Sequence, residues 1–248
     1  MKTPTLLMIF VVLSAICFGQ EIQKTRVHIE SIYLEPHIGI NRVESLMESS
    51  RYFNNYHASG KVSPYFGIDA VFRFRSNLLF QTGLRYMEHN TGTDSLNIPP
   101  VGRDDIWSAF TCEYKSINIP IKLGYQLRLA GNSIVLRPQF GIALRFLGGH
   151  QYSESVNTPD IPFNPGSIAI PPAEVYDFEK FGIGVEGGLV LILFNNQKIS
   201  PFVSANYFRS STIFKLIRGY ESNLSDSHQI GAIREKGFLL SVGANFGL

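Results

Sequence analysis

One stretch of the chain, SINIPIKLGYQL at 116–127, places a large apolar residue at every second position. This apolar parity consists of Ile117, Ile119, Ile121, Leu123, Tyr125 and Leu127. Successive side chains of a β-strand point to opposite faces of its sheet, so the stretch predicts a strand with one oily face and one polar face. The class of the protein depends on what the oily face contacts.

The same period of two recurs along the chain. It predicts further strands at 32–40, 66–74, 78–86, 134–146, 181–191 and 238–248, and a weaker one at 201–211 whose facing stays open. Tight connections, rich in Gly, Asn and Ser, are expected at 75–77, 130–133 and 195–198. Long connections are expected at 41–62, 88–113, 148–178 and 211–236. Eight strands joined alternately by long and tight connections predict an all-β, antiparallel up-and-down barrel, with residues 20–248 forming a single domain.

The N-terminus has the pattern of a secretory signal peptide. Lys2 precedes an apolar run from Leu6 to Phe18, and Gly19 is a small residue suited to the cleavage site. The run is shorter than the roughly 20 residues that a spanning helix needs. We therefore expect residues 1–19 to be cleaved. Cys112 is then the one cysteine of the exported chain, so the fold has no internal disulfide.

Composition excludes one class of partner and favours another environment. The net charge is +2 without a basic run, which argues against a nucleic-acid partner. Charged residues make up 17% of the chain, against about 25% in a typical soluble domain. The charged fraction is thus low for a soluble domain.

Alternation alone cannot tell which face of a barrel is outside. A soluble lipocalin-like barrel has its apolar parity inside, and a membrane barrel has it outside. Here the polar parity is rich in Gly, which suits a cramped interior, and it carries isolated charges of both signs near mid-strand. These charged residues, predicted to form a polar network in the lumen, are Glu35, Asp69, Arg73, Arg85, Lys122, Arg137, Arg145 and Glu186.

The oily parity and the loop lengths agree with this interpretation. The oily runs match the ten to twelve residues with which a tilted strand crosses a bilayer, as estimated from roughly 3.3 Å per residue. Short turns at one end and long loops at the other are typical of outer-membrane barrels, whose turns are periplasmic. The sequence thus predicts a transmembrane barrel of the bacterial outer membrane. In it Ile117, Ile119, Ile121, Leu123 and Tyr125 face lipid. Pro120 and Pro138 predict a bulge or a gap in the strand ladder.

Two segments resemble a known family. The strand INIPIKLGYQL at 117–127 and the closing GFLLSVGANFGL at 237–248 are similar to those of the PorT-like outer-membrane β-barrel family of Bacteroidota. The final strand also resembles the signal read by the barrel-assembly machinery, with Phe246 in the matching parity. The resemblance implies an outer-membrane barrel. Since the family's namesake takes part in protein export, it also implies a possible link to that process.

The sequence predicts no catalytic, cofactor or metal site. GIGVEG at 182–187 fits the dinucleotide-binding pattern of spaced glycines, but a strand rather than a helix follows it. His89, His150 and His228 fall on the long-loop side without close ligand spacing. We therefore expect a non-enzymatic envelope structural or interaction protein with a side-chain-filled lumen.

Two alternatives stay open from the sequence. One is a small barrel enzyme that modifies lipid A, for which Ser108, His89 and Glu113 are the residues to consider. The other is a secreted lipocalin-like ligand-binding barrel.

The expected partners of the barrel are outer-membrane lipid, the barrel-assembly machinery and an envelope protein held by the loops or the periplasmic rim. Tyr152, Phe163 and Tyr176, from the proline-rich connection 148–178, form a possible contact surface.

Overall fold

The computed structural model describes residues 29–49, 56–97, 107–129, 133–157, 174–195, 198–218 and 228–248. The expected signal peptide, residues 1–19, lies outside the described residues. The described residues form ten strands: β1 (Ile29–Ser49), β2 (Tyr56–Phe74), β3 (Leu78–Asn97), β4 (Trp107–Tyr125), β5 (Leu127–Leu129), β6 (Ile134–Asn157), β7 (Glu174–Phe178), β8 (Phe181–Leu193), β9 (Ile199–Arg218) and β10 (His228–Gly247). Among the described residues no helix is long and apolar enough to cross a membrane.

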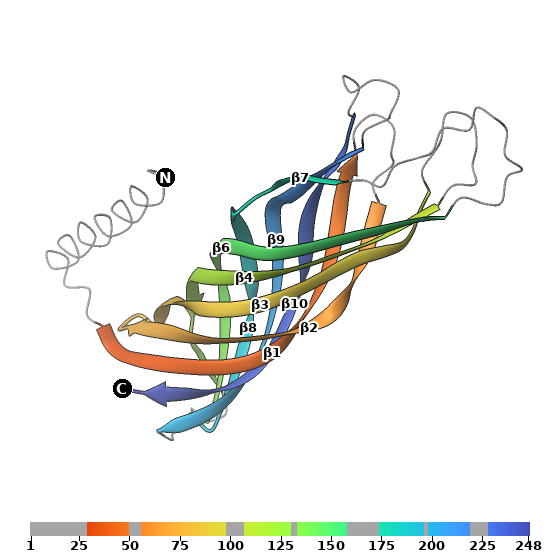
Figure 1. Cartoon of the computed structure of the whole chain (residues 1–248). Coiled ribbons are helices and arrows are strands. Elements are labelled where there is room, and N and C mark those ends of the chain that lie inside the picture. Colours follow the sequence, from red (N-terminus) through yellow and green to blue (C-terminus); the bar gives the residue numbers. More distant parts are fainter. Residues whose placement is uncertain are drawn as a thin grey trace, which may run out of the picture.

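Eight long strands close into an antiparallel barrel (Figure 1). Each long strand pairs with its neighbours in chain order, and β10 pairs with both β9 and β1, which closes the sheet. The short β5 continues the pairing of β4 with β6, and the short β7 pairs with β9 just before β8 begins. The predicted eight-stranded up-and-down barrel is confirmed.

The strands extend well beyond the segments that the periodicity marks. The turn at 75–77 lies where it was predicted, and residues 130–132 and 196–197 of the other two turns lie outside the described residues. The strands, however, are longer than predicted, because β6 runs to Asn157 and β1 to Ser49. Each long connection is therefore shorter than predicted, because strand residues occupy both ends of its predicted range. The predicted ranges were 41–62, 88–113, 148–178 and 211–236. Tyr152 belongs to β6 and Tyr176 to β7, so neither is a loop residue, and Phe163 lies outside the described residues. Strand pairing continues beyond the segments whose length matches the bilayer. Backbone N–H and C=O groups gain hydrogen bonds from pairing there, whether or not the side chains are apolar.

The apolar parity of every long strand lies on the outside of the barrel. In β4, Leu123 is 67% exposed, Ile117 46% and Tyr125 42%, while Ile119 and Ile121 are half-buried among outer-face neighbours. The open facing of 201–211 is settled, because Val203 and Tyr207 are exposed and Phe202 is buried. A soluble lipocalin-like barrel would have the opposite arrangement.

The exposed apolar side chains form a continuous band around the barrel. From Ile117 to Leu127 the band covers about 33 Å along the strand, or about 25 Å of height at a tilt of about 40°. Aromatic pairs mark its upper edge: the rings of Phe66 and Tyr86 are 5.1 Å apart, and those of Tyr207 and Phe238 are 5.3 Å apart. An apolar band edged by aromatic rings is the outer surface of a transmembrane barrel.

Prolines open gaps in the ladder and leave the register unchanged. The β3–β4 pairing skips Pro120 and resumes in the same register, and the β1–β10 pairing skips Pro36 in the same way. Pro138 lies opposite the break between β4 and β5. Since proline lacks the N–H group, each of these residues removes hydrogen bonds toward one neighbouring strand only.

Candidate functional site

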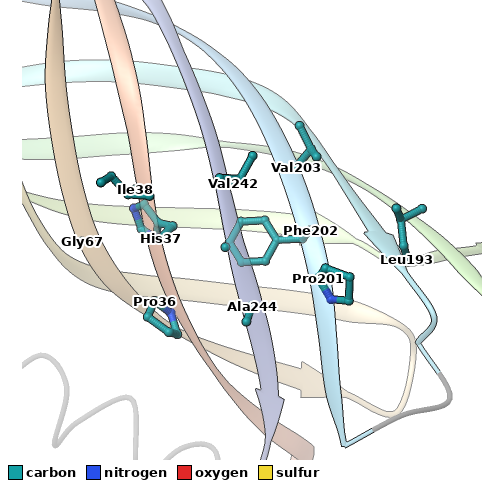
Figure 2. A pocket seen from close by; sticks show the side chains of 11 residues that line it. Pro36, His37, Ile38, Gly67, Leu193, Pro201, Phe202, Val203, Val242 and Ala244 are labelled. Atoms are coloured by element: carbon teal, nitrogen blue, oxygen red, sulfur yellow. The ribbon is translucent and has the colours of Figure 1, made fainter.

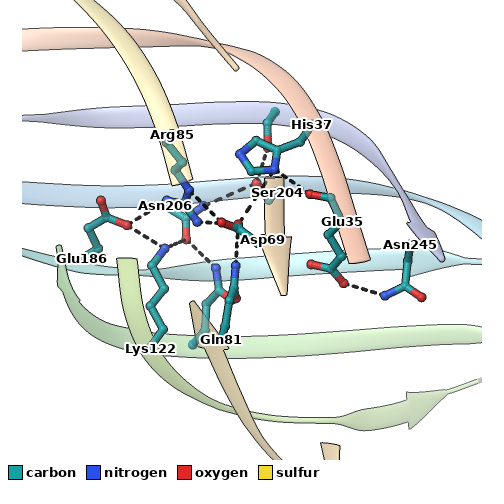
Figure 3. A network of polar contacts seen from close by, with 12 residues as sticks. Glu35, His37, Asp69, Gln81, Arg85, Lys122, Glu186, Ser204, Asn206 and Asn245 are labelled. Atoms are coloured by element: carbon teal, nitrogen blue, oxygen red, sulfur yellow. Dashed lines mark hydrogen bonds and ion pairs between the residues drawn. The ribbon is translucent and has the colours of Figure 1, made fainter. Parts of the chain in front are cut away.

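The lumen is filled by polar side chains that come from all the long strands. The described residues include four buried carboxylates and four buried bases, so the formal charges of the interior balance. The carboxylates are Glu35, Asp69, Glu186 and Glu235, and the bases are Arg85, Lys122, Arg137 and Arg145. Figure 3 shows the central part of this network. Buried charges require such pairing, because an unpaired one loses its hydration without compensation.

The first cluster links strands on opposite sides of the lumen. Arg137 of β6 donates to both carboxylate oxygens of Glu35 in β1, at 2.8 Å from Nη1 to Oε1 and 2.6 Å from Nη2 to Oε2. Asn245 of β10 donates to Glu35 Oε1 as well, at 2.5 Å. Two parallel N–H···O bonds fix both the position and the orientation of the guanidinium.

The second cluster is a chain of alternating charges. Arg85 donates to Asp69 through Nε and Nη2, at 3.3 and 2.7 Å, and through Nη1 to Glu186 at 3.0 Å. Lys122 Nζ lies 2.7 Å from Glu186 Oε2. Gln81 donates to Asp69 Oδ2 at 2.7 Å. Each carboxylate therefore has at least two donors, and Lys122 has the carboxylate that its position in the strand requires.

Neutral amides and hydroxyls connect these clusters to β9 and β10. Asn206 accepts hydrogen bonds from Gln139 at 2.8 Å and from Lys122 at 3.3 Å. Ser204 and Ser241 share a hydrogen bond of 2.6 Å. The network thus spans the barrel from wall to wall, which leaves little free volume. Two cavities within it measure about 10 Å³ each. A volume of roughly 10–15 Å³ holds one water molecule.

A third cluster lies nearer the loop end. Arg145 donates to Glu235 Oε2 at 3.1 Å, His89 Nδ1 lies 3.4 Å from the same oxygen, and His89 Nε2 lies 2.8 Å from Ser116 Oγ. The His89 ring stacks on Tyr114, with centroids 4.4 Å apart and planes 3° apart. His89 and Tyr114 are each three residues beyond the outer-face residues that end the apolar band, so this cluster lies outside the membrane-spanning segments.

Ser116, His89 and Glu235 have the connectivity of a nucleophile, a base and an orienting carboxylate. Burial lowers the pKa of His89 and keeps the imidazole neutral, as a general base must be. Ser116 is nevertheless only 2% exposed, and Arg145 Nη2 lies 3.3 Å from the same His89 nitrogen. A hollow of about 570 Å³ on the loop side is lined by His89 and Tyr114, and Ser116 does not line it. Among the described residues, Ser116 therefore lies within a buried polar cluster and apart from this hollow.

The residues considered for a lipid A enzyme do not converge. His89 points into the lumen, whereas Glu113 lies on the outer face, where it accepts a hydrogen bond from Asn90 at 2.7 Å. These residues lie on opposite sides of the wall because their positions in the paired strands have opposite parity. The third of these residues, Ser108, lies in β4, and its side chain is outside the described side chains.

Most of the sequence-predicted charges meet in the lumen, and Arg73 is the exception. It pairs with Glu30 at 3.3 Å near the tight-turn end, apart from the central network. Arg73 lies apart from the central network because it is near the end of β2, where the lumen opens. Sequence reasoning did not include Glu235 or His37 among the lumen residues, and it assigned His89 to the long-loop side, whereas all three are buried. Glu235 continues the inward parity of Leu239 and Ser241, so extending the last strand by a few residues would have found it.

An apolar hollow of about 620 Å³ lies where β1, β10 and β9 meet (Figure 2). Figure 2 shows His37 and Phe202 beside it, and the outward residues Ile38, Val203 and Val242 lie around it. It adjoins the ladder gap at Pro36. Among the described residues no group of three or more His, Cys, Asp or Glu side chains is arranged to hold a metal ion.

No family model and no curated protein sequence matches this chain. Three solved outer-membrane proteins align with most of it. OprG from Pseudomonas aeruginosa covers 90% of this chain and 98% of its own length, with 10% identity and a TM-score of 0.46. Neisserial surface protein A covers 87% and 96%, with 14% identity and a TM-score of 0.37. The protease OmpT from Escherichia coli covers 90% and 98%, with 8% identity and a TM-score of 0.36. Such distant matches assign neither a family nor an activity to this chain.

Proposed function

We propose that this chain is an integral barrel of the bacterial outer membrane that serves as a non-enzymatic structural or interaction protein. The observation that carries the proposal is the combination of an apolar outer band with a lumen closed by balanced, hydrogen-bonded charges. The apolar band requires lipid around it.

A channel is disfavoured by the same network. The remaining cavities of about 10 Å³ each hold roughly one water molecule, far less than a hydrated ion needs. Opening a path would separate the bidentate pair of Glu35 with Arg137. Breaking a buried ion pair costs about 3–5 kcal/mol. The lumen therefore works as a rigid plug that holds the barrel in one shape.

The rigid barrel carries its binding surfaces at the ends. Strands such as β6 continue well past the apolar band toward the loops, so paired sheet projects from the membrane there. Loops and rims on a rigid scaffold commonly carry binding. The sequence resemblance to PorT-like barrels makes protein export the first process in which to seek the partner.

The test uses the full chain expressed in a bacterium with an outer membrane. The expected results are recovery in the outer-membrane fraction, a heat-dependent mobility shift in detergent gels, and no conductance in planar bilayers in which a porin control conducts. A protein that stays soluble without detergent would overturn the membrane assignment. Stable conductance at the level of the porin control would overturn the closed lumen. Cross-linking of the cells followed by purification then identifies the envelope partner.

A further inference from the structure

A group of basic residues lies on the outer wall where the last two strands meet the first. Arg42 of β1, Arg209 of β9 and Lys236 of β10, called here the cation cluster, share the outward parity of their strands. Arg42 and Arg209 are exposed, and Lys236 is partly exposed. Arg234, two residues beyond Lys236, adds a fourth cation and donates to Thr212 at 3.4 Å.

Two members of the cluster oppose each other directly. Lys236 is the cross-strand partner of Arg209 in the β9–β10 ladder. Directly opposed residues have Cβ atoms about 4.5–5.5 Å apart, and like charges in such a pair are destabilising. Arg42 opposes Phe238, two residues from Lys236, so it is a diagonal neighbour of the same pair. The sheet therefore places positive charges directly opposite each other, where their repulsion is destabilising.

Only part of this charge is compensated by the protein. Glu44 opposes Lys236 in the β1–β10 ladder and lies 3.3 Å from its Nζ. Within the described part of the chain, neither Arg42 nor Arg209 has a carboxylate within ion-pair distance. Among the described residues, the cluster thus has three cations against one carboxylate, which leaves room for an anionic ligand.

The height of the cluster identifies the layer that it faces. Tyr207 and Phe238, the aromatic pair at the upper edge of the apolar band, are each two residues from Arg209 or Lys236 on the same face. Aromatic rings at such an edge lie at the level of the lipid headgroups. The loops lie at this end of the barrel, so the layer is that of the outer leaflet.

The opposite wall does not share the excess of positive charge. Above the Phe66–Tyr86 edge, Lys115 lies 3.8 Å from Glu88, and Glu113 is a second carboxylate nearby. Among the described side chains of β3 and β4, one lysine there meets two carboxylates. The positive charge is therefore a local property of the seam formed by β9, β10 and β1.

We propose that the cation cluster binds the phosphate groups of outer-leaflet lipid headgroups. This inference rests on the proposed function, since it needs the barrel to lie in a membrane. Arginine side chains offer planar pairs of N–H donors that match phosphate oxygens, and a lysine adds a point charge. A lipid phosphate at the aromatic edge would offset the repulsion between Arg209 and Lys236. It would also hold one side of the barrel against the leaflet.

The test compares two vesicle compositions with the refolded full-length barrel. One contains phosphatidylcholine with bis-phosphorylated lipid A, and the other contains phosphatidylcholine with the dephosphorylated lipid. Lipid co-purifying with the extracted barrel is counted by native mass spectrometry. The double variant Arg209→Gln/Lys236→Gln should retain about twenty-five-fold less lipid A, because each basic residue at an anionic surface contributes roughly a fivefold factor. The control variant Lys115→Gln should retain as much lipid A as the original chain.

The outcomes separate this inference from the proposed function. A barrel that inserts into both vesicles but retains the two lipids equally overturns the inference and leaves the membrane assignment intact. A chain that inserts into neither overturns both. Loss of lipid A with Lys115→Gln to the same extent as with the double variant would show a general surface charge effect and overturn the site. Retention that free inorganic phosphate removes fully would assign the cluster to soluble phosphate and overturn the lipid assignment.

Discussion

Glu35 and Arg137 lie 102 positions apart in the chain and meet in a bidentate ion pair across the lumen. Both side chains are buried. Arg137→Leu should lower the free energy of unfolding by about 3–5 kcal/mol, because Glu35 is left charged in a closed interior. The double variant Glu35→Leu/Arg137→Leu should recover part of that loss. Urea unfolding in lipid vesicles measures both, and equal losses in the single and double variants would contradict the pairing.

Because Gly83 has no side chain, it leaves space for the Asp69 carboxylate, which binds Arg85. A Cβ atom at Gly83 would collide with Asp69 Oδ1 and with the carbonyl oxygen of Ile68. Gly83→Ala should therefore destabilise the barrel by about 1–3 kcal/mol, as overpacking does in other interiors. Gly148→Ala is the matched control, since no atom lies within 4 Å of its Cβ position. Heat-dependent gel mobility compares the two, and equal transition temperatures would refute the prediction.

Cys112 lies beyond the apolar band, five residues from Ile117, and its side chain is fully buried. Burial raises the pKa of the Cys112 thiol to about 12. At pH 8 only about one thiol in ten thousand is then the reactive thiolate. Maleimide should label the folded protein at least about a hundredfold more slowly than the urea-unfolded chain. In a Cys112→Ala background, Thr111→Cys should react fast, because the neighbouring residue faces outward. Rapid labelling of folded Cys112 would place it on the surface.

Ser116 has a histidine within 2.8 Å but is closed off from solvent. A fluorophosphonate probe, which labels activated serines, should leave the folded barrel unlabelled. Labelling that disappears in Ser116→Ala and persists in Ser210→Ala would instead reveal a working nucleophile. That result would revive the enzyme alternative and argue against the proposed function.

The period-two pattern was sufficient to predict the eight strands, the tight turn at 75–77 and the inward parity of most lumen charges. These features are local, because side-chain alternation follows from the extended backbone itself. Lys122 and Glu186 could each be placed on the inner face from their own strand. Their partners could not be chosen, since Glu35, Asp69 and Glu186 were all candidates for Lys122.

Tertiary structure decided what depends on strand register and barrel closure. It selected Glu186 for Lys122 and Arg137 for Glu35, and it added Glu235, which the sequence pattern left in a loop. Register fixes such pairs because partners a hundred residues apart meet only when every intervening strand is paired. The tertiary structure also settled the facing of 201–211 and brought Arg209 beside Lys236. The sequence by itself thus determined which residues share a face and, for most strands, which face is outside. Only the closed sheet decided which charges meet, because the partners are set by contacts between strands.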